Sequence, residues 1–295
     1  MFRLMYRQRR RILIGGLFTG LTMLLAFQDL PEFHLHSSNT PLKTWAIFIL
    51  TLTIMTAAIM MIYAVFIAFF KRWRFLVELL PVFWFLVTVL EPVHSALPLP
   101  EYLKPFLWFA GWMLFYTMVY GTGLDDYRSK FSWRSRRSVV LPMAPEDVWP
   151  KLAVAEGCED QNWEPIIHEV RQAEGQPDVF DVQYKMGPSI FQHQTQTVLA
   201  KDENTHFRYR FQGDTAPGNS GLSDGVFDIR LEPRGEESTR LTLEMSQKEM
   251  LPRVALLVWF DDLLGDKVDG FRARLAGKRD WSVTGLTHRE ILRLS

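Results

Sequence analysis

The chain has 295 residues, with 33 basic and 33 acidic side chains, and therefore no formal net charge at neutral pH. A domain that binds nucleic acid usually carries a basic excess, so this balance argues against nucleic acid as the main partner. The single cysteine, Cys158, excludes an intrachain disulfide and fits a reducing compartment. The length is that of about two domains, and the composition changes near residues 121–137 from mostly apolar to mostly charged.

Four apolar runs in the first 124 residues are predicted to be membrane-spanning helices. A spanning helix needs roughly 20 mostly apolar residues, because each residue rises about 1.5 Å and the hydrocarbon core is about 30 Å thick. The second run contains no charged residue, whereas the third contains Glu78 and Glu91 near its ends. We expect a four-helix transmembrane bundle over residues 1–124, with spans at about 12–28, 45–70, 75–97 and 105–124.

Basic residues are distributed unequally among the short loops between these runs. Five precede the first run, three lie between the second and third, and five follow the fourth, whereas the two opposite loops contain only Lys43 and Lys104. Because cytoplasmic loops carry the basic excess, both termini are predicted to be cytoplasmic. No small-x-small cleavage site closes the first run, so we interpret it as a retained span. The expected location is an integral membrane one, in a bacterial inner membrane.

Three features of this half have a functional and a structural interpretation. Gly16 and Gly20 would let another helix approach closely, and we expect ordinary packing within the same bundle. An acid inside a membrane is a functional candidate, but Glu91 is expected at the solvated outer end of its span. His34 and His36 supply two ligands at most, too few for a metal site, so a surface loop is expected there.

From Ser138 onward the apolar residues alternate in short runs that are typical of strands. A first strand is predicted at 137–141 and is followed by a short helix that opens with proline and two acids. A long helix with apolar residues at three- and four-residue spacing is predicted at 252–277. Six further strands are predicted between them, at 166–171, 178–186, 191–200, 206–212, 225–232 and 238–246.

The C-terminal half is expected to divide into three segments. They are a basic and aromatic juxtamembrane linker at 125–136, a soluble domain at 137–280 and a C-terminal tail at 281–295.

Several local motifs occur in this half in a fixed order. They are Val-x-Leu-Pro-Met-Ala-Pro-Glu-Asp-Val-Trp at 139–149, Trp163-x-Pro165 before the second strand, and Gly-x-Phe-x-x-x-Leu-x-Pro at 225–233. Together with the closing long helix they resemble the helix-grip fold of the START-like and polyketide cyclase-like superfamily (SRPBCC), over about residues 137–279. The resemblance implies an α+β domain in which a curved antiparallel sheet wraps around the long helix and leaves a cavity for an apolar ligand.

The alternation within the strands independently predicts one aromatic and apolar face with a few polar members. In the run at 191–200 we assign His193 and Thr195 to this face and the intervening glutamines to the other. A filled core would show the same alternation, so packing and ligand contact both remain open for each residue. The candidate ligand-binding residues are Phe180, Tyr184, His193, Thr195, Tyr209 and Phe227, with Trp163 and Trp259 as possible gates.

Catalysis is not indicated by any local motif, and we assign no catalytic residue, metal or cofactor. Cys158 lies among acidic residues, which raise the pKa of a thiol and make it a poor nucleophile. His193 with Tyr184 or Tyr209 is the only acid–base pairing that the pattern offers. The favoured function is a membrane-anchored binding or transfer protein for a lipid or other hydrophobic small molecule.

Two alternatives remain open at this stage. One is an accessory subunit or assembly factor of a larger membrane complex, with other membrane proteins as partners. The other is a cyclase- or dehydratase-like enzyme that acts on a membrane-associated polyketide- or isoprenoid-like substrate.

Overall fold

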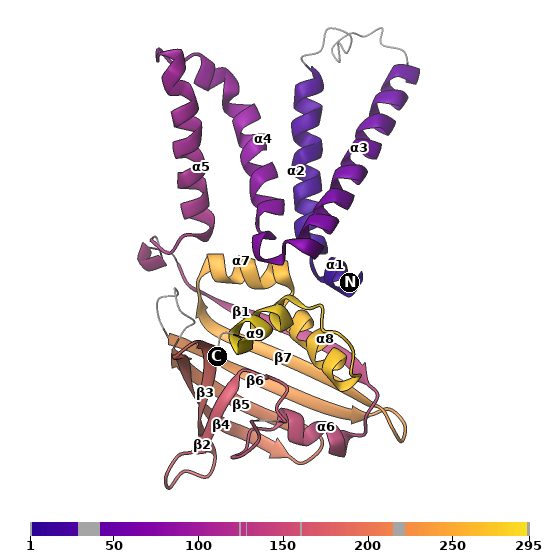
Figure 1. Cartoon of the computed structure of the whole chain (residues 1–295), viewed down its shortest axis with the longest axis vertical. Coiled ribbons are helices and arrows are strands. Elements are labelled where there is room, and N and C mark those ends of the chain that lie inside the picture. Colours follow the sequence, from indigo (N-terminus) through magenta and orange to yellow (C-terminus); the bar gives the residue numbers. More distant parts are fainter. Residues whose placement is uncertain are drawn as a thin grey trace. The chain divides into compact units, whose positions relative to one another are not determined.

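The computed structural model describes residues 2–28, 42–123, 125–127, 129–159, 161–214 and 222–293. The predicted loop with His34 and His36 lies outside these residues. The chain forms two compact units, Met1–Gly121 and Thr122–Ser295 (Figure 1). The first is helical, and the second combines a sheet with helices.

The described part of the first unit consists of helices joined by short 3₁₀ turns. Three of its segments are long and apolar enough to cross a membrane, namely Arg9–Phe27, Trp45–Phe69 and Lys71–Ser95. The helices are α1 (Phe2–Arg7), α2 (Arg9–Gln28), α3 (Leu42–Phe69), α4 (Leu76–Ser95) and α5 (Lys104–Tyr120), with 3₁₀ turns η1 (Lys71–Trp73) and η2 (Glu101–Leu103).

The fourth predicted span, 105–124, is shorter in the structure than expected. Helix α5 has 17 residues, or about 25 Å at 1.5 Å per residue, and it ends at Tyr120. Gly121, with extended backbone angles, ends the helix. A Cβ atom at this position would lie 2.6 Å from the backbone oxygen of Thr117. The structure therefore contains three candidate spans in its described residues, and the expectation of four is corrected.

The acid inside the third run is paired. Glu78 of α4 is 4% exposed and forms an ion pair with Arg11 of α2, and it accepts a hydrogen bond from the hydroxyl of Tyr120. Glu91, by contrast, is exposed and accepts a hydrogen bond of 2.7 Å from Ser95. Glu78 thus links three helices of its unit.

Glycines on α2 permit close contact with the two neighbouring helices. A Cβ atom on Gly15 would lie 2.3 Å from the backbone oxygen of Val77 in α4. A Cβ atom on Gly16 would lie 2.5 Å from Cγ of Met60 in α3. This surface of α2 is therefore used for packing inside the same unit.

Replacing Gly15 by alanine is expected to destabilise the helical unit. The added methyl group meets backbone that cannot move aside alone, and overpacking of this kind costs about 1–3 kcal/mol. Gly111→Ala is the matched control, because the nearest atom to its Cβ would be a ring carbon of Phe83 at 3.9 Å. Thermal unfolding of the full chain in detergent should show a lower midpoint for Gly15→Ala only; equal midpoints would contradict the packing described.

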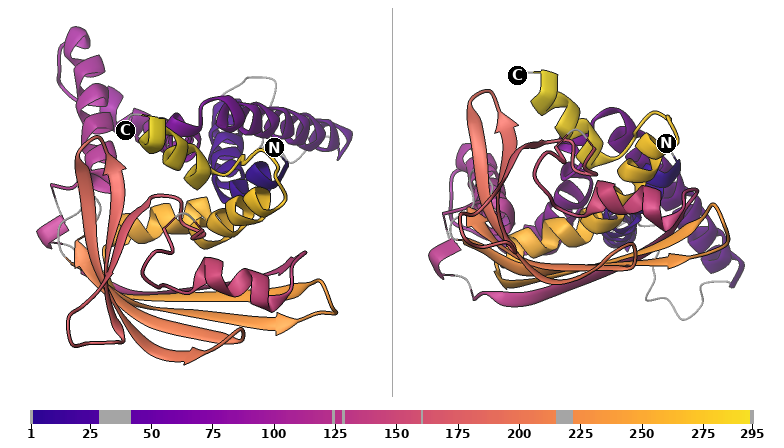
Figure 2. Two further views of the ribbon diagram at one scale, coloured as in Figure 1. Left: turned by 60° about the horizontal axis from the view of Figure 1, so that its bottom comes forward. Right: turned by 90° about the horizontal axis from the view of Figure 1, so that it is seen from below.

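The second unit contains one antiparallel sheet of seven strands in the order β1-β7-β6-β5-β4-β3-β2, consistent with a helix-grip fold. Figure 2 shows the curved sheet with the helices of this unit on one side. The strands are β1 (Phe131–Leu141), β2 (Ile167–Gln172), β3 (Val179–Gly187), β4 (Ile190–Asp202), β5 (His206–Asp214), β6 (Leu222–Pro233) and β7 (Thr239–Met250). The helices are α6 (Pro145–Leu152), α7 (Pro252–Asp261), α8 (Leu263–Leu275) and α9 (Val283–Arg293), and Asp125–Tyr127 forms the 3₁₀ turn η3.

The core of this unit lies between the inner face of the sheet and helices α6 and α8. Alternate residues of the central strands, such as Phe207, Ile229 and Leu243, are at most 1% exposed. They pack in one cluster with Val148 of α6 and Val268 of α8. Burial of this apolar area stabilises the unit by about 25 cal/mol for each Å² removed from water.

The predicted long helix at 252–277 is interrupted in the structure. Asp262 separates α7 from α8 and adopts a left-handed conformation, with φ 46° and ψ 50°. Its carboxylate is 1% exposed and accepts a hydrogen bond of 2.8 Å from Nε of Arg137 in β1. The ion pair with a distant strand therefore holds the residue at which the helix changes direction.

Two predicted segment boundaries also differ from the structure. Strand β1 begins at Phe131, inside the expected linker at 125–136, and pairs with β7 over most of its length. The expected tail at 281–295 contains helix α9, which packs against α8 and β3. Both segments therefore belong to the folded unit.

Candidate ligand-binding cavity

A cavity of about 450 Å³ lies between the inner face of the sheet and helices α7, α8 and α9. Three elements close it opposite the sheet: α7 contributes Val254 and Val258, α8 contributes Leu263 and Lys267, and α9 contributes His288. The rest of the apolar wall comes from the sheet and the residue before it, namely Ile166, Met186, Phe211, Phe227 and Met245. Such a volume and lining are typical of sites for small apolar ligands.

Hydrogen-bonded polar side chains interrupt this apolar wall on β3 and β4. Nε2 of Gln196 donates to the hydroxyl oxygen of Tyr184 at 3.0 Å and to Oε1 of Gln194 at 2.9 Å. The hydroxyl of Tyr184 also donates to Oε1 of Gln194, at 3.2 Å. Gln196 is 1% exposed, and its Oε1 has no hydrogen-bond partner among the described residues. A buried acceptor without a partner costs about 1–3 kcal/mol, which a water molecule would recover; Gln196 itself is not among the described residues that line the cavity.

An ion pair marks the end of the cavity. Glu164 precedes β2 and binds the ammonium group of Lys267 on α8, and that ammonium also lies 5.7 Å from the centre of the Trp163 ring. Burial alone would raise the pKa of the Glu164 carboxyl, but the charge and hydrogen bond of Lys267 outweigh this effect and lower the pKa below its usual value. The carboxylate is therefore ionised.

The two tyrosines of the wall are protonated. Burial raises the pKa of Tyr184 well above its usual value, and the negative charge of Glu164 raises it further. Burial and Glu164 raise the pKa of Tyr209 in the same way. Both hydroxyls are therefore available as hydrogen-bond donors at any physiological pH.

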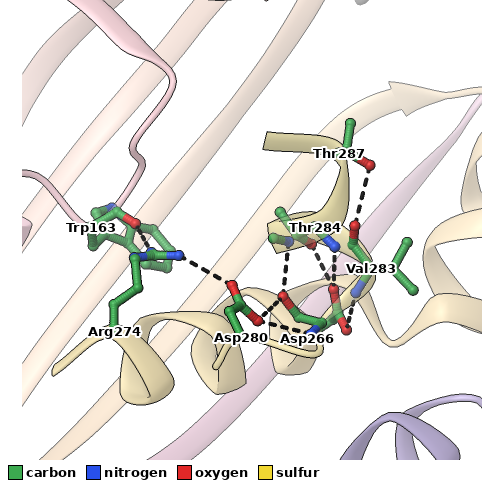
Figure 3. A network of polar contacts seen from close by, with 9 residues as sticks. Trp163, Asp266, Arg274, Asp280, Val283, Thr284 and Thr287 are labelled. Carbon is green, nitrogen blue, oxygen red and sulfur yellow. Dashed lines mark hydrogen bonds and ion pairs between the residues drawn. The ribbon is translucent and has the colours of Figure 1, made fainter. Parts of the chain in front are cut away.

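Helix α9 is fixed by a buried carboxylate on α8. Asp266 is 1% exposed and accepts hydrogen bonds from the backbone N–H groups of Val283 and Thr284, at 3.1 and 2.8 Å, and from the hydroxyl of Thr284 at 2.7 Å (Figure 3). A carboxylate at a helix N-terminus is favourable because the first N–H groups have no partner within the helix. This contact sets where His288, further along α9, meets the cavity.

The same region is tied to the corner before β2. Arg274 of α8 donates to the backbone oxygen of Trp163 and forms an ion pair of 3.5 Å with Asp280 (Figure 3). These contacts and the pair between Glu164 and Lys267 join α8 to one corner of the sheet.

Residues 132–277 match the protein family described as polyketide cyclase / dehydrase and lipid transport. This part of the chain is an SRPBCC-like domain. No curated protein matches the sequence significantly.

Several solved structures resemble this part of the chain, all at low identity. A conserved protein from Geobacillus kaustophilus is 17% identical, with 49% of this chain and 96% of that chain covered and a TM-score of 0.38. The protein Ara h 8.0201 is 13% identical, with 50% and 99% covered and a TM-score of 0.37. The Zhui aromatase/cyclase from Streptomyces sp. R1128 is 18% identical, with 54% and 96% covered and a TM-score of 0.32.

Three of the eight residues proposed from the sequence line the cavity, namely Tyr184, Tyr209 and Phe227. Trp163 lies behind this wall, with its ring 5.8 Å from that of Phe227. Phe180 is buried in the core of the SRPBCC-like domain. Trp259 contacts the ring of Phe260 at 5.1 Å and is not among the described residues that line the cavity.

His193 and Thr195 lie on the outer face of the sheet, contrary to the sequence prediction. Residues directly opposite in an antiparallel pair share a face, and the register places Tyr184 opposite Gln192. The glutamines of β4 therefore point inward. Thr195 donates to Oδ1 of Asp181 at 3.0 Å in an exposed position, and both predicted residues line an outer depression. The acid–base pairing of His193 with an inner tyrosine is thereby ruled out.

The sequence analysis missed three charged or ionisable residues of the site: Glu164, Lys267 and His288. For Lys267 a signal was present, since it follows Leu263 by four residues and precedes Val268, within the apolar stripe of the long predicted helix. A charged residue inside such a stripe indicates a buried partner. Glu164 and His288 lie outside periodic segments, so pattern alone does not find them.

The stability of the folded chain is expected to fall as the pH is lowered from about 6.5 to about 4. Burial lowers the pKa of His288 from 6.5 to about 4. Among its neighbours, the carboxylates of Glu164 and Asp280 raise this pKa, and the cations of Lys267 and Arg274 lower it. In this window the unfolded chain binds a proton at His288 and the folded chain does not, so unfolding is favoured by up to about 3 kcal/mol. The contribution of Glu164, whose pKa is also lowered, is lost only below 4.5.

Circular dichroism of thermal unfolding as a function of pH measures this effect. His288→Gln should flatten the dependence between pH 6.5 and 4.5, whereas His193→Gln on the outer face should leave it unchanged. The same slope in all three proteins would contradict the burial of a neutral His288.

Proposed function

We propose that this protein binds an apolar small molecule or lipid in the cavity of its SRPBCC-like domain, and that its apolar helices anchor it to a membrane. The observation that carries the proposal is the cavity itself, because core side chains leave unfilled the part of the inner face that lies beside α7, α8 and α9. Eight apolar residues and a few hydrogen-bonding groups line it, the combination that small-molecule sites use for affinity and orientation. The matched family, which includes lipid transport in its description, supports the same class of ligand.

The surface of the helical unit supports the membrane anchor. Only 6% of the most apolar window of α3 is buried, and Ile47, Ile54, Met61 and Ile62 are each about 60% exposed or more. A contiguous apolar surface of this size is unfavourable in water and is stable in hydrocarbon. Lipid that surrounds these helices would also provide the reservoir from which an apolar ligand reaches the cavity.

Filling the cavity is expected to abolish ligand retention. Met245→Trp combined with Val258→Trp adds two indole groups to the wall, and we expect at least tenfold less apolar ligand to co-purify with the full chain. Val140→Trp is the matched control, because Val140 is 46% exposed and is not among the described residues of the wall. Solvent extraction followed by mass spectrometry measures the ligand, and equal amounts from the wild type and the filled variant would show that the cavity does not hold it.

The orientation in the membrane is a further part of the proposal. Five basic residues precede α2 or begin it, which supports a cytoplasmic N-terminus. The SRPBCC-like domain lies on the same side only if α5 crosses too, and its 17 residues are at the short limit for a span.

Paired reporter fusions test this orientation in cells. A fluorescent protein and a phosphatase that is active only outside the cytoplasm are each fused after Pro100 and after Lys130. With the three candidate spans alone, we expect phosphatase activity at both positions. Fluorescence at Lys130 together with phosphatase activity at Pro100 would show instead that α5 crosses as well and that the domain is cytoplasmic.

The alternative of an accessory subunit makes a different prediction for the same variants. In that case the filled-cavity variant would retain its partners and its cellular role, because the interaction surface lies elsewhere.

Among the described residues, no group of three or more His, Cys, Asp and Glu side chains is placed to hold a metal ion.

A further inference from the structure

We propose that the cavity selects an uncharged ligand, with a single hydroxyl or carbonyl group at one end of an apolar body, and discriminates against anions and cations of equal length. This inference rests on the proposed function and names the chemical class of its ligand. It follows from the charges, the unpaired polar atoms and the size of the cavity.

The charges that line the cavity cancel. Glu164 and Lys267 are the only Asp, Glu, Lys or Arg residues among the described lining residues, and each is the ion-pair partner of the other. Their side chains are 13% and 29% exposed, so neither charge is fully solvated. A ligand that brought a further charge would bury it without a compensating partner, which is strongly unfavourable.

The third ionisable group at this end adds no charge. His288 is 8% exposed, and its imidazole is neutral at physiological pH because burial lowers its pKa to about 4. A cationic imidazole would otherwise have favoured an anionic ligand. The polar end of the cavity is therefore neutral in sum.

Hydrogen-bonding capacity is nevertheless left over at this end. Nδ1 of His288 is buried and has no hydrogen-bond partner among the described residues. Oε1 of Gln196 also lacks a partner among them, but Gln196 is not among the described residues that line the cavity, so it is not one of the groups that face a ligand. Tyr209, whose pKa is raised, supplies a protonated hydroxyl to the wall. These groups suit a ligand atom that accepts one hydrogen bond and, in a hydroxyl, donates another.

The size of the cavity limits the apolar body. About 450 Å³ is the volume of roughly 15 water molecules, at about 30 Å³ each, and therefore of a similar number of carbon atoms with their hydrogens. One alkyl chain or a small ring system has this volume, and a two-chain phospholipid does not fit. The ligand class is therefore a single-chain or compact apolar alcohol, ketone or aldehyde.

Three photoactivatable probes that differ only in their end group test the selectivity. Each has an alkyl chain of about 14 carbons, chosen to match the cavity volume, with a diazirine in the chain. The end groups are a hydroxyl, a sulfonate and a primary amine. The full chain is placed in phosphatidylcholine nanodiscs with each probe at pH 7.5, and labelled peptides are quantified by mass spectrometry. Labelling of strands β3 to β5 is divided by labelling of α3, which contacts the same lipid in every sample.

The alcohol is expected to label the cavity peptides at least tenfold more than either charged probe. Glu164→Gln leaves the charge of Lys267 without its partner, so labelling by the sulfonate should rise about tenfold. Lys267→Gln leaves the carboxylate instead, and labelling by the amine should rise. The double variant Glu164→Gln and Lys267→Gln has no charge at this position, so its cavity peptides should again be labelled preferentially by the alcohol.

Glu169→Gln is the matched control, because it is the same chemical change in a residue that lines the outer depression of the sheet. It should leave all three ratios as in the wild type. The opposite responses of the two single variants distinguish a charge effect from a loss of folding, which would lower all three signals together. Circular dichroism of each variant confirms that it is folded.

Equal labelling by the three probes, or ratios that do not change in the charge variants, would overturn the inferred ligand class and leave the proposed function standing. An absence of cavity labelling by every probe, with α3 labelled normally, would overturn the proposed function itself. Preferential labelling by the sulfonate in the wild type would show that Lys267 acts as an anion site despite Glu164.

Discussion

The ion pair between Glu164 and Lys267 is the interaction on which the site depends. It joins two positions 103 residues apart in the sequence, one at the corner before β2 and the other on α8. Two charges removed from water cost several kcal/mol each, and their attraction offsets this cost only if both are present. The pair therefore holds α8 at a fixed place against the corner of the sheet, and loss of one partner leaves a buried charge.

Several other properties of the cavity follow from this pair. The carboxylate of Glu164 contributes to the raised pKa values of Tyr184 and Tyr209, which keeps both hydroxyls as donors. Burial is the main cause of the lowered pKa of His288; the ammonium of Lys267 lowers it further, and the carboxylate of Glu164 raises it. Burial, together with the charges of the pair, thus sets the protonation of these three neighbours. The outcome is a polar end with donors and acceptors but no net charge.

The sequence predicts the elements well where the signal is local. Six of the seven strands are found close to their predicted ranges, because alternation and turn residues mark them. Prediction from the sequence fails where a residue far along the chain determines which face a side chain lies on or where a helix ends. In β4 both faces contain polar residues, so local alternation cannot choose between His193 and Gln194; the register with β3 makes that choice. The break at Asp262 likewise depends on Arg137, a residue 125 positions earlier.

The helical unit shows the same limit in another form. Apolar composition identifies α2, α3 and α4 as candidate spans, because hydrocarbon imposes a length and a polarity that any single helix must satisfy. The end of α5 is set by Gly121 and its contact with the preceding turn, which a count of apolar residues does not register. Glu78, which interrupts the third run, has its partner on another helix, Arg11.

The protonation states of the cavity favour binding over acid–base catalysis. A general base that works near neutral pH needs a pKa close to 7. Glu164 is held below its usual pKa by Lys267, and His288 has a pKa of about 4, so both accept protons poorly. The pKa values of both tyrosines are raised, which makes them weak acids. Groups that neither gain nor lose a proton readily are suited to orienting a neutral polar end by hydrogen bonds, while the apolar wall provides the affinity.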